Sequence, residues 1–381
     1  MTAPPATEPP RTDPDGTYPD GTYPARTDPD GMSRRYATLV VAALSIVVLT
    51  CVAFLIPVPY VTMKPGPAFN TLGQFDGKPM FSFGKGIKTY PTSGSLDFTT
   101  VSVTRADSHV PLAGAVRAYF DSNTAVVPKS LIYPDQQSAS ESTTVSAAQL
   151  ADSKDTSRAA ALQAAGYKVT SVPAVQSVLK GGASVGKLIA GDVIDKIDGV
   201  KPGSAEAVAS AISARKPGDK VSVTVSRDDA QQTVSIVTKP DPKDQTKARI
   251  GISLGEKFVF PIDITNNVGS EIGGPSAGTM FALAIYDRLT PGSLTGGKRV
   301  AGTGEITGDG IVQPIGGIRQ KMAGASADRA SIFLVPTANC AEALKGDNLG
   351  MKLVRITTLK SAISALEKLS ADPLATVPTC N

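Results

Sequence analysis

One serine in this 381-residue chain lies in a setting suited to nucleophilic catalysis. The run Gly273–Gly278 reads Gly-Gly-Pro-Ser-Ala-Gly, and apolar residues follow at helical spacing: Ala277, Met280, Phe281, Ala284 and Ile285. Ser276 is therefore expected in the first turn of a helix, where free backbone amides can stabilise an oxyanion. Pro275 suits a helix start, and Gly274, Pro275 and Ala277 would border the oxyanion or substrate groove. A serine at a helix start is more often only a cap.

A nucleophilic serine needs a general base, and histidine is a poor candidate in this chain. Residues 274–278 satisfy the G-x-S-x-G elbow of α/β-hydrolases, but those enzymes need a histidine after the serine. The only histidine, His109, precedes Ser276 in the loop-like stretch Ser108–Pro111 and is interpreted as a surface residue. A trypsin-like order using His109 is formally open, although the serine's context differs. A lysine can serve instead if burial lowers its pKa from ~10.4 toward ~7 to 8.

Lys321 is the lysine that fits this requirement. The stretch 318–328 is predicted to be a helix on which Ile318, Met322 and Ala325 share the face of Lys321, while Arg319 and Gln320 point away. Most lysines on an apolar stripe extend their ammonium group to water. The position of Lys321 by itself therefore leaves its role open.

The residues around Lys321 closely resemble the C-terminal half of Lon protease domains. The resemblance is carried by Thr303-Gly304-Glu305, Gly308, Gly310, Pro314-Ile315-Gly316-Gly317-Ile318, Lys321, Pro336 and Asn339, with Gly-Pro-Ser-Ala-Gly placed forty-five residues before the lysine. It implies Ser276 as nucleophile and Lys321 as general base. Thr303 and Glu305 would orient the lysine or shape the site. The acidic residue that often precedes Gly-Pro-Ser in this family is Gly273 here.

A second resemblance precedes the catalytic motifs. Leu188–Gly199 resembles the central signature of PDZ domains, and a predicted helix at 205–214 and the stretch Gly218–Arg227 continue that pattern. The resemblance implies a module that binds an extended peptide as an added strand. Its contact residues would be Tyr167, Val169 and Val172, although the usual Gly-Leu-Gly-Phe loop is absent there. A domain that only spaces or gates the protease is the alternative.

Several partners and cofactors are disfavoured by residue type. Gly181–Lys187 reads G-x-x-x-x-G-K, but Leu188 follows where a P-loop needs Ser or Thr, so no nucleotide is expected. The net charge is only +4 and the basic residues are scattered, which argues against nucleic acid. One histidine and three cysteines without CxxC spacing argue against a metal site. We therefore expect no cofactor.

The N-terminal segments indicate a membrane anchor. Residues 1–36 are rich in Pro, Asp, Thr and Gly and are expected to be a disordered cytoplasmic tail. Residues 37–56 form an uncharged apolar run that can cross a ~30 Å hydrocarbon layer. Pro57 and Pro59 occupy the place of a cleavage site, which favours an uncleaved helix over a signal peptide. Arg34 and Arg35 favour an N-terminus in the cytoplasm and a catalytic domain outside it.

The predicted fold class is α+β, with several units after the membrane helix. They are an N-terminal region expected to supply the first part of the Lon-type domain (57–165), a PDZ-like domain (166–240), the catalytic domain (241–372) and a C-terminal tail (373–381). Cys340 and Cys380 are the only cysteines outside the apolar run, and exposure outside the cytoplasm would let them pair. Two free thiols are the alternative.

The sequence as a whole predicts a membrane-anchored serine endopeptidase that acts on extracytoplasmic polypeptides. No ATPase motif accompanies the catalytic motifs, so ATP independence is expected. A PDZ and Lon-like scaffold that binds exported polypeptides without cleaving them is the alternative. The sequence leaves monomeric and homo-oligomeric states open.

Overall fold

A computed structural model describes residues 29–133, 138–227, 230–347 and 350–380 of the chain. Residues 1–28, most of the predicted disordered tail, lie outside the described residues. The described chain mixes helices and strands, which confirms the α+β class. It divides into two units, of which one comprises residues up to Val58 together with Pro111–Ala113, and the other comprises the rest.

The smaller unit contains the apolar helix. Helix α1 (Pro29–Leu55) begins before the predicted start at residue 37, and its stretch Arg34–Leu55, with a mean hydropathy of 2.7, is long and apolar enough to cross a membrane. A signal sequence near an N-terminus would have the same length and composition. Just after the helix, the backbone amide of Leu112 donates to the carbonyl of Ile56 at 3.0 Å. The chain thus returns to the end of α1 about fifty residues later.

The larger unit is built on a six-stranded sheet whose order is β21-β20-β17-β6-β2-β8. Its strands are β2 (Tyr60–Asn70), β6 (Ser95–Val103), β8 (Ala125–Pro128), β17 (Arg299–Gly302), β20 (Ile332–Pro336) and β21 (Lys352–Ile356). Strands β6, β17, β20 and β21 run parallel, and β2 pairs antiparallel with β6 and β8. Strands from before and after the PDZ segment therefore share one sheet.

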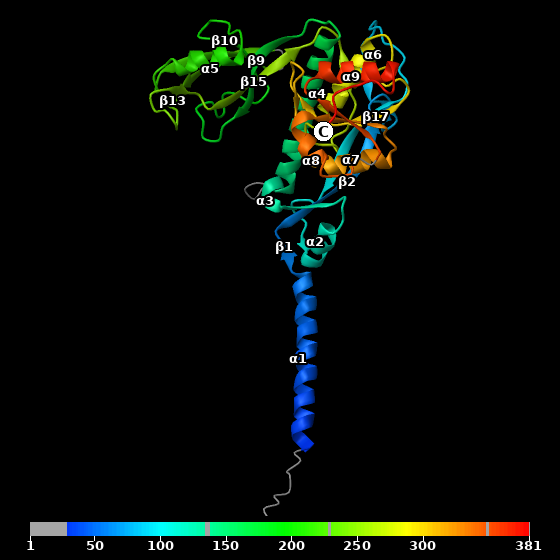
Figure 1. The fold of residues 1–381 in the computed structure, drawn as a ribbon. Helices are drawn as coiled ribbons and strands as arrows, with labels where there is room; N and C mark the ends of the chain where they lie inside the picture. The colour runs from blue at the N-terminus through cyan, green and yellow to red at the C-terminus, as the bar shows by residue number, and fades with distance from the viewer. Residues whose placement is uncertain (1–28, 134–137, 228–229, 348–349, 381) are drawn as a thin grey trace, which may run out of the picture. The chain divides into compact units, whose positions relative to one another are not determined.

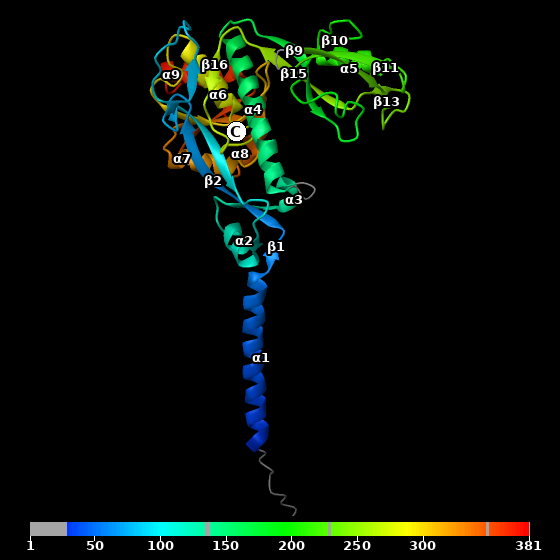
Figure 2. The ribbon, with the colours of Figure 1, turned by 180° about the vertical axis from the view of Figure 1, so that it is seen from behind.

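Four helices complete the core around this sheet. They are α4 (Ala139–Ala164), α6 (Gly278–Leu289), α7 (Ile318–Ala327) and α9 (Leu359–Ala371). Helix α4 begins at a capping box of Ser138 and Glu141, and it runs beside α6 (Figure 2). Helix α6 is buried on nearly all sides, and its Phe281 ring packs edge-on against Phe98 of β6. The helix that follows the Gly-Pro-Ser run is thus packed on both faces.

Short elements connect these parts. Three two-stranded ribbons are β3 (Gln74–Phe75) with β4 (Lys78–Pro79), β5 (Phe81–Phe83) with β16 (Ile264–Asn266), and β18 (Glu305–Ile306) with β19 (Val312–Gln313). The remaining short elements are β1 (Pro57–Val58), β7 (Val110–Pro111), α2 (Leu112–Tyr119), α3 (Lys129–Ile132), the 3-10 helix η2 (Thr337–Asn339) and α8 (Cys340–Ala343).

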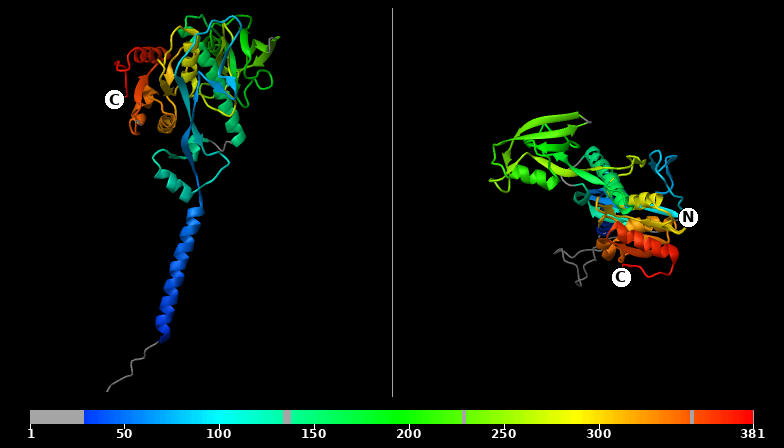
Figure 3. Two further views of the ribbon diagram at one scale, coloured as in Figure 1. Left: turned by 90° about the vertical axis from the view of Figure 1, so that its right-hand side faces the viewer. Right: turned by 90° about the horizontal axis from the view of Figure 1, so that it is seen from above.

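The PDZ region forms a five-stranded sheet in the order β12-β11-β10-β9-β15 (Figure 1). Its strands are β9 (Thr170–Val178), β10 (Val193–Ile197), β11 (Lys220–Arg227), β12 (Ala230–Val237) and β15 (Ile252–Val259), with a ribbon of β13 (Lys239–Pro240) and β14 (Ala248–Arg249). Helix α5 (Ala205–Ser213) covers one face of this sheet (Figure 3). It buries Val208 and Ile212 against the sheet. The apolar face of α5 and the alternating valines of β11 build this separate core.

The predicted boundary at residue 240, between the PDZ-like and catalytic domains, disagrees with the strand pairing. Residues after 240 were expected in the catalytic domain, yet β15 pairs antiparallel with β9 along the PDZ sheet, from Ile252 with Val178 to Val259 with Thr170. Pairing between strands seventy or more residues apart leaves no local mark in the sequence. The PDZ sheet therefore extends to residue 259.

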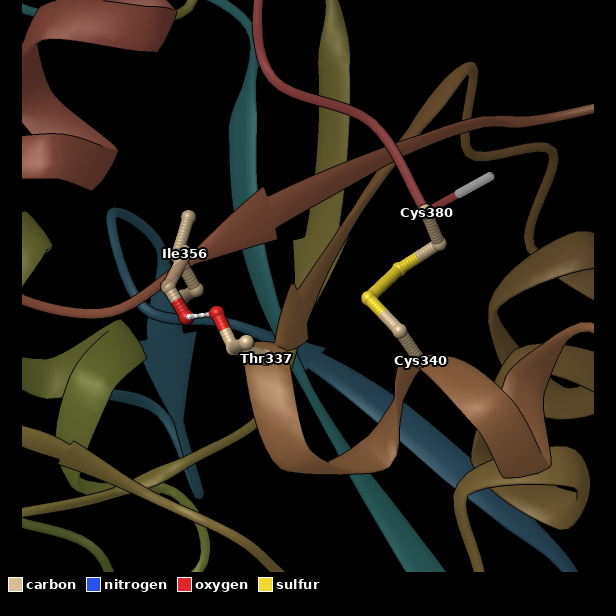
Figure 4. Close-up of a disulfide and its surroundings, with 4 residues drawn as sticks. All are labelled: Thr337, Cys340, Ile356 and Cys380. Carbon is tan, nitrogen blue, oxygen red and sulfur yellow. Dashed lines mark hydrogen bonds between the residues drawn. A yellow bond between two sulfur atoms is a disulfide. The ribbon is translucent and has the colours of Figure 1, made fainter.

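A disulfide joins Cys340 and Cys380, with 5.2 Å between their Cα atoms (Figure 4). The C-terminal tail runs beside β21, because the Arg355 amide donates to the Pro378 carbonyl and the Cys380 amide donates to the Leu353 carbonyl. Close by, the Thr337 hydroxyl donates to the Ile356 carbonyl at 3.1 Å. The disulfide thus closes a loop that contains β21 and α9.

Candidate active site

Ser276 lies in a turn directly before helix α6. The helix begins at Gly278 with Ala277 as its N-cap, so Ser276 precedes the first turn instead of lying within it. Gly274 has a φ of 84°, a left-handed conformation that glycine adopts without strain. The Ser276 carbonyl accepts hydrogen bonds from the Gly304 amide at 2.9 Å and from the Thr303 hydroxyl at 3.0 Å. The Thr-Gly-Glu segment therefore fixes the backbone of Ser276.

Lys321 reaches Ser276 from helix α7. Its Nζ atom lies 2.7 Å from Ser276 Oγ and 3.0 Å from Thr303 Oγ1. The Lys321 side chain is 2% exposed, and this burial lowers its pKa to about 7. A neutral amine at this position can accept the proton of the Ser276 hydroxyl at near-neutral pH.

The face of α7 that carries Lys321 is apolar as predicted, since Ile318, Met322 and Ala325 are all buried. Gln320, predicted to point away from that face, is buried as well, with only 4% exposed. Helix α7 packs against β2, β6 and α8, so more than one of its faces is covered. Arg319 is half-buried.

The two supporting residues differ in position. Thr303 is fully buried and bridges Lys321 and the Ser276 carbonyl. Glu305 is exposed and pairs with Gln313 in the β18–β19 ribbon. Within the described part of the chain, Glu305 makes no hydrogen bond or ion pair with Lys321. Thr303 thus orients the lysine, whereas Glu305 can only shape the surroundings.

A cleft of about 260 Å³ opens onto the two side chains. It is lined by Pro67, Phe98, Thr99, Thr100, Val101, Ser102, Glu271, Ile272, Gly273, Gly274, Ser276, Ala277 and Lys321. Strand β17 pairs with β6 only as far as Phe98, so the following residues of β6 have an open edge on that side. A strand edge beside a nucleophile is a place where an extended peptide can bind.

Backbone amides remain free at this cleft. The amides of Ser276 and Ala277 donate to no described protein acceptor, whereas the Gly274 amide is already bonded to the Ser146 carbonyl at 3.0 Å. Two free amides at the start of α6 can donate to an oxyanion. Of the predicted groove residues, Ala277 therefore supplies an amide, and Gly274 and Pro275 shape the turn.

Helix α4 positions the Ser276 turn, a role that the catalytic motifs of the sequence did not predict. The buried Ser153 hydroxyl donates to the Pro275 carbonyl at 3.0 Å, and Ser146 accepts from Gly274. A Cβ atom on Gly273 would lie 2.8 Å from the Ser146 Cβ, so the acidic residue expected there in Lon domains would collide with α4. The Ser-x-x-Glu capping box at Ser138 was the available sequence signal.

The predicted peptide strand of the PDZ region is not open. Tyr167 and Val169 pack against the core of the catalytic region, and Val172 pairs with Lys257 of β15. The prediction for these three residues therefore conflicts with the strand order, in which β9 lies between β10 and β15. The edge strand next to β9 is β15.

A groove of about 500 Å³ lies between α5 and the start of β15. It is lined by Leu179, Ala209, Ser210, Ile212, Ser213, Asp241, Lys247, Ala248, Arg249, Ile250, Gly251, Ile252, Ser253 and Leu254. Gly251 has a φ of 75° and packs against the backbone of Gly182, which leaves no room for a side chain. The run Ile250-Gly251-Ile252 was the sequence signal for this groove.

Two remaining residues of interest lie elsewhere. His109 is exposed in a loop, in agreement with its interpretation as a surface residue. Lys187, from the G-x-x-x-x-G-K run, donates to the Ser235 carbonyl within the PDZ region. Among the described residues, no group of three potential metal ligands occurs.

Known protein families match the two regions separately. Residues 149–238 match the PDZ domain, and residues 268–356 match the Lon protease (S16) C-terminal proteolytic domain. The chain therefore combines a PDZ domain with a Lon-type proteolytic domain.

Individual proteins are similar to parts of the chain. Lon protease 2 of Herpetosiphon aurantiacus is 42% identical over 94 residues, which are 24% of this chain and 11% of that protein. Lon protease 2 of Bacillus subtilis is 30% identical over 107 residues, which are 28% of this chain and 19% of that protein. The chain thus spans less than a fifth of either protein. The solved PDZ domain of an SdrC-like protein from Listeria monocytogenes is 30% identical and covers 22% of this chain and 86% of its own, with a TM-score of 0.21.

Proposed function

We propose that this chain is a serine endopeptidase in which Ser276 is the nucleophile and Lys321 the general base. The observation that carries this proposal is the 2.7 Å contact between Ser276 Oγ and the buried Nζ of Lys321. Neutral Lys321 takes the Ser276 proton as Oγ attacks the scissile carbonyl carbon. The amides of Ser276 and Ala277 donate to the resulting oxyanion.

The second half of the reaction returns the enzyme to its starting state. The protonated Lys321 gives its proton to the leaving amine, and an acyl ester remains on Ser276. Water then attacks the ester with Lys321 again as base, and Ser276 regains its proton. Thr303 holds Nζ in line with Oγ throughout, because its hydroxyl contacts both Lys321 and the Ser276 carbonyl.

Fluorophosphonate labelling of the full-length chain in detergent micelles tests this proposal. Such probes attach to activated serines, so the wild-type chain should be labelled at Ser276 and should cleave unfolded casein without added ATP. Ser276→Ala should abolish both reactions, whereas Ser235→Ala, at an exposed serine of the PDZ sheet, should change neither. A folded wild-type chain that neither reacts nor cleaves would favour the alternative of a non-catalytic scaffold.

For the PDZ domain we propose that an extended polypeptide adds to the free edge of β15 in the groove beside α5. The groove joins an unpaired strand edge to apolar residues such as Ile212 and Leu254, the combination that strand addition requires. Peptide selection on the full chain tests this. Ala209→Lys on the groove side of α5 should abolish enrichment, and Ala207→Lys, exposed on the same helix outside the groove, should retain it. Equal enrichment by both variants would argue against this groove.

We further propose that α1 anchors the chain in the cell membrane with its N-terminus in the cytoplasm. The stretch Arg34–Leu55 has the required length and hydropathy, and Arg34 and Arg35 lie at its N-terminal end. The substrates would then be exported or membrane-associated polypeptides. Protease added to cells without an outer barrier should digest the region after residue 57, and protection of that region would reverse the topology.

A further inference from the structure

We propose that helix α2 lies in the lipid–water interface of the membrane that α1 crosses, with Val116, Tyr119 and Phe120 inserted among the lipid headgroups. This inference rests on the proposed membrane anchoring. It adds a second membrane contact, which is made by α2 instead of the membrane-spanning helix α1.

The first observation is the unusual exposure of these side chains. Val116 is 40% exposed, Tyr119 76% and Phe120 82%, although all three are large and apolar or aromatic. They follow one another at i, i+3 and i+4, so they share one face, while Ala115 and Ala118 are buried on another. The Tyr119 and Phe120 rings also contact each other, with 5.6 Å between their centroids. An exposed apolar helix face of this kind indicates an interaction surface.

The second observation is the position of α2 along the chain. The Leu112 amide, at the start of α2, donates to the carbonyl of Ile56, the residue that follows the apolar stretch Arg34–Leu55. An eight-residue helix is only ~12 Å long, and the headgroup layer on each side of a bilayer is ~5 to 8 Å thick. Wherever α1 ends at the membrane, α2 therefore begins there too.

A second returning segment supports the same placement. The Lys129 amide, at the start of α3, donates to the carbonyl of Pro59, which is three residues from Ile56 and so within ~11 Å of it. Leu131 in α3 is 73% exposed. Helices α2 and α3 thus both present exposed apolar side chains.

The chemistry of these segments suits a bilayer surface. Tyrosine and other aromatic side chains favour the headgroup level, where an apolar ring and a polar group are both accommodated. Arg117 is exposed on α2 and Lys129 is half-buried at the start of α3, and both cations can pair with phosphate groups. The membrane is favoured over a protein partner because the hydrogen bond from Leu112 to Ile56 holds the start of α2 at the end of α1 with or without a partner.

Tryptophan fluorescence provides the test, because the chain contains no tryptophan. We would place Phe120→Trp in the full chain, in single-copy lipid nanodiscs of phosphatidylcholine with a minor share of phosphatidylglycerol. Brominated phosphatidylcholine should quench most of the emission, which should also lie at shorter wavelength than in water. Val200→Trp, at a residue 71% exposed in a PDZ turn, is the matched control and should remain unquenched.

A third reporter separates this inference from the anchoring proposal. Leu44→Trp lies within α1 and should be strongly quenched if α1 spans the bilayer. Quenched Leu44→Trp with unquenched, water-like Phe120→Trp would overturn the interfacial placement of α2 and leave the anchor intact. Unquenched Leu44→Trp would overturn the anchor itself. Since each nanodisc holds one chain, quenching of Phe120→Trp cannot arise from a contact with a second copy.

Discussion

The Lys321 amine is buried among apolar side chains and contacts two hydroxyl groups. This environment determines how the reaction rate should respond to pH. Because only the neutral amine accepts a proton, acylation should rise with pH through the lowered pKa of about 7. Lys321→Arg should remove labelling by fluorophosphonate at every pH, since a guanidinium stays protonated. Rapid labelling of folded Lys321→Arg would contradict the assignment of Lys321 as base.

The same burial should make Lys321 a destabilising residue. Its pKa is about 7 when folded and 10.5 as the ordinary value, so between these values the unfolded chain binds more protons and the free energy of unfolding rises with pH. Lys321→Met should therefore stabilise the protein most below pH 7, by at most ~5 kcal/mol at ~1.4 kcal/mol per pKa unit. Urea unfolding at pH ~6 and ~9 measures this gain, and a gain that grows with pH would refute the argument.

Thr303 should matter for catalysis beyond its contribution to stability. Thr303→Val keeps the shape but removes the hydroxyl that contacts Lys321 and the Ser276 carbonyl. We expect acylation to slow by ~10 to 100-fold, with a stability loss of ~1 kcal/mol. Thr71→Val removes an equally buried hydroxyl that donates to Leu96, so it should cost similar stability and leave acylation unchanged. Equal rates in the two variants would reduce Thr303 to a packing residue.

Among the elements, α4 determines which residues the Ser276 turn can accept. Its Ser146 lies so close to Gly273 that a Cβ atom there would be 2.8 Å from the Ser146 Cβ, and Ser153 holds Pro275. The glycine that replaces the usual acidic residue is thus a consequence of how closely the helix approaches the turn. The Ser276 turn depends on a helix that comes more than a hundred residues earlier in the chain.

Gly273→Ala tests this dependence on α4. The added methyl group should displace the turn from Ser146, and acylation should fall by ~10-fold or more because small misplacements of a nucleophile are costly. Gly203→Ala is the control, because its backbone conformation suits alanine and no atom lies within 4 Å of the added Cβ. Thermal unfolding of both variants shows whether the fold is kept. Unchanged acylation in Gly273→Ala would mean that the turn tolerates a shift away from α4.

For the molecule as a whole, the Cys340–Cys380 disulfide closes a loop across a sequence separation of 40 residues. On the chain-entropy model this bond stabilises the fold by ~4 kcal/mol. Cys340→Ser with Cys380→Ser should lower the urea midpoint accordingly, and reductant should lower that of the wild type but not of the double variant. Equal midpoints for the wild-type and double-variant chains under non-reducing conditions would show that the bond does not contribute.

The sequence by itself determined those features of the protein that are encoded in short stretches of residues. Resemblance to known families implied a role for Thr303 and the PDZ and Lon-type regions. Residue type and spacing identified Ser276 and Lys321 as candidates, the apolar run before residue 57 and the α+β class. These features depend on helical period, turn residues and side-chain chemistry within short windows.

Only the tertiary structure decided which segments meet. It brings Lys321 within 2.7 Å of Ser276 and buries Gln320. It also places α4 against the Ser276 turn. In the PDZ sheet, β15 is an edge strand, whereas the segment with Tyr167, Val169 and Val172 is not. Strand order and helix contacts depend on the total apolar area buried by distant segments. No short window of the sequence contains that information, because the partner of each surface lies elsewhere in the chain.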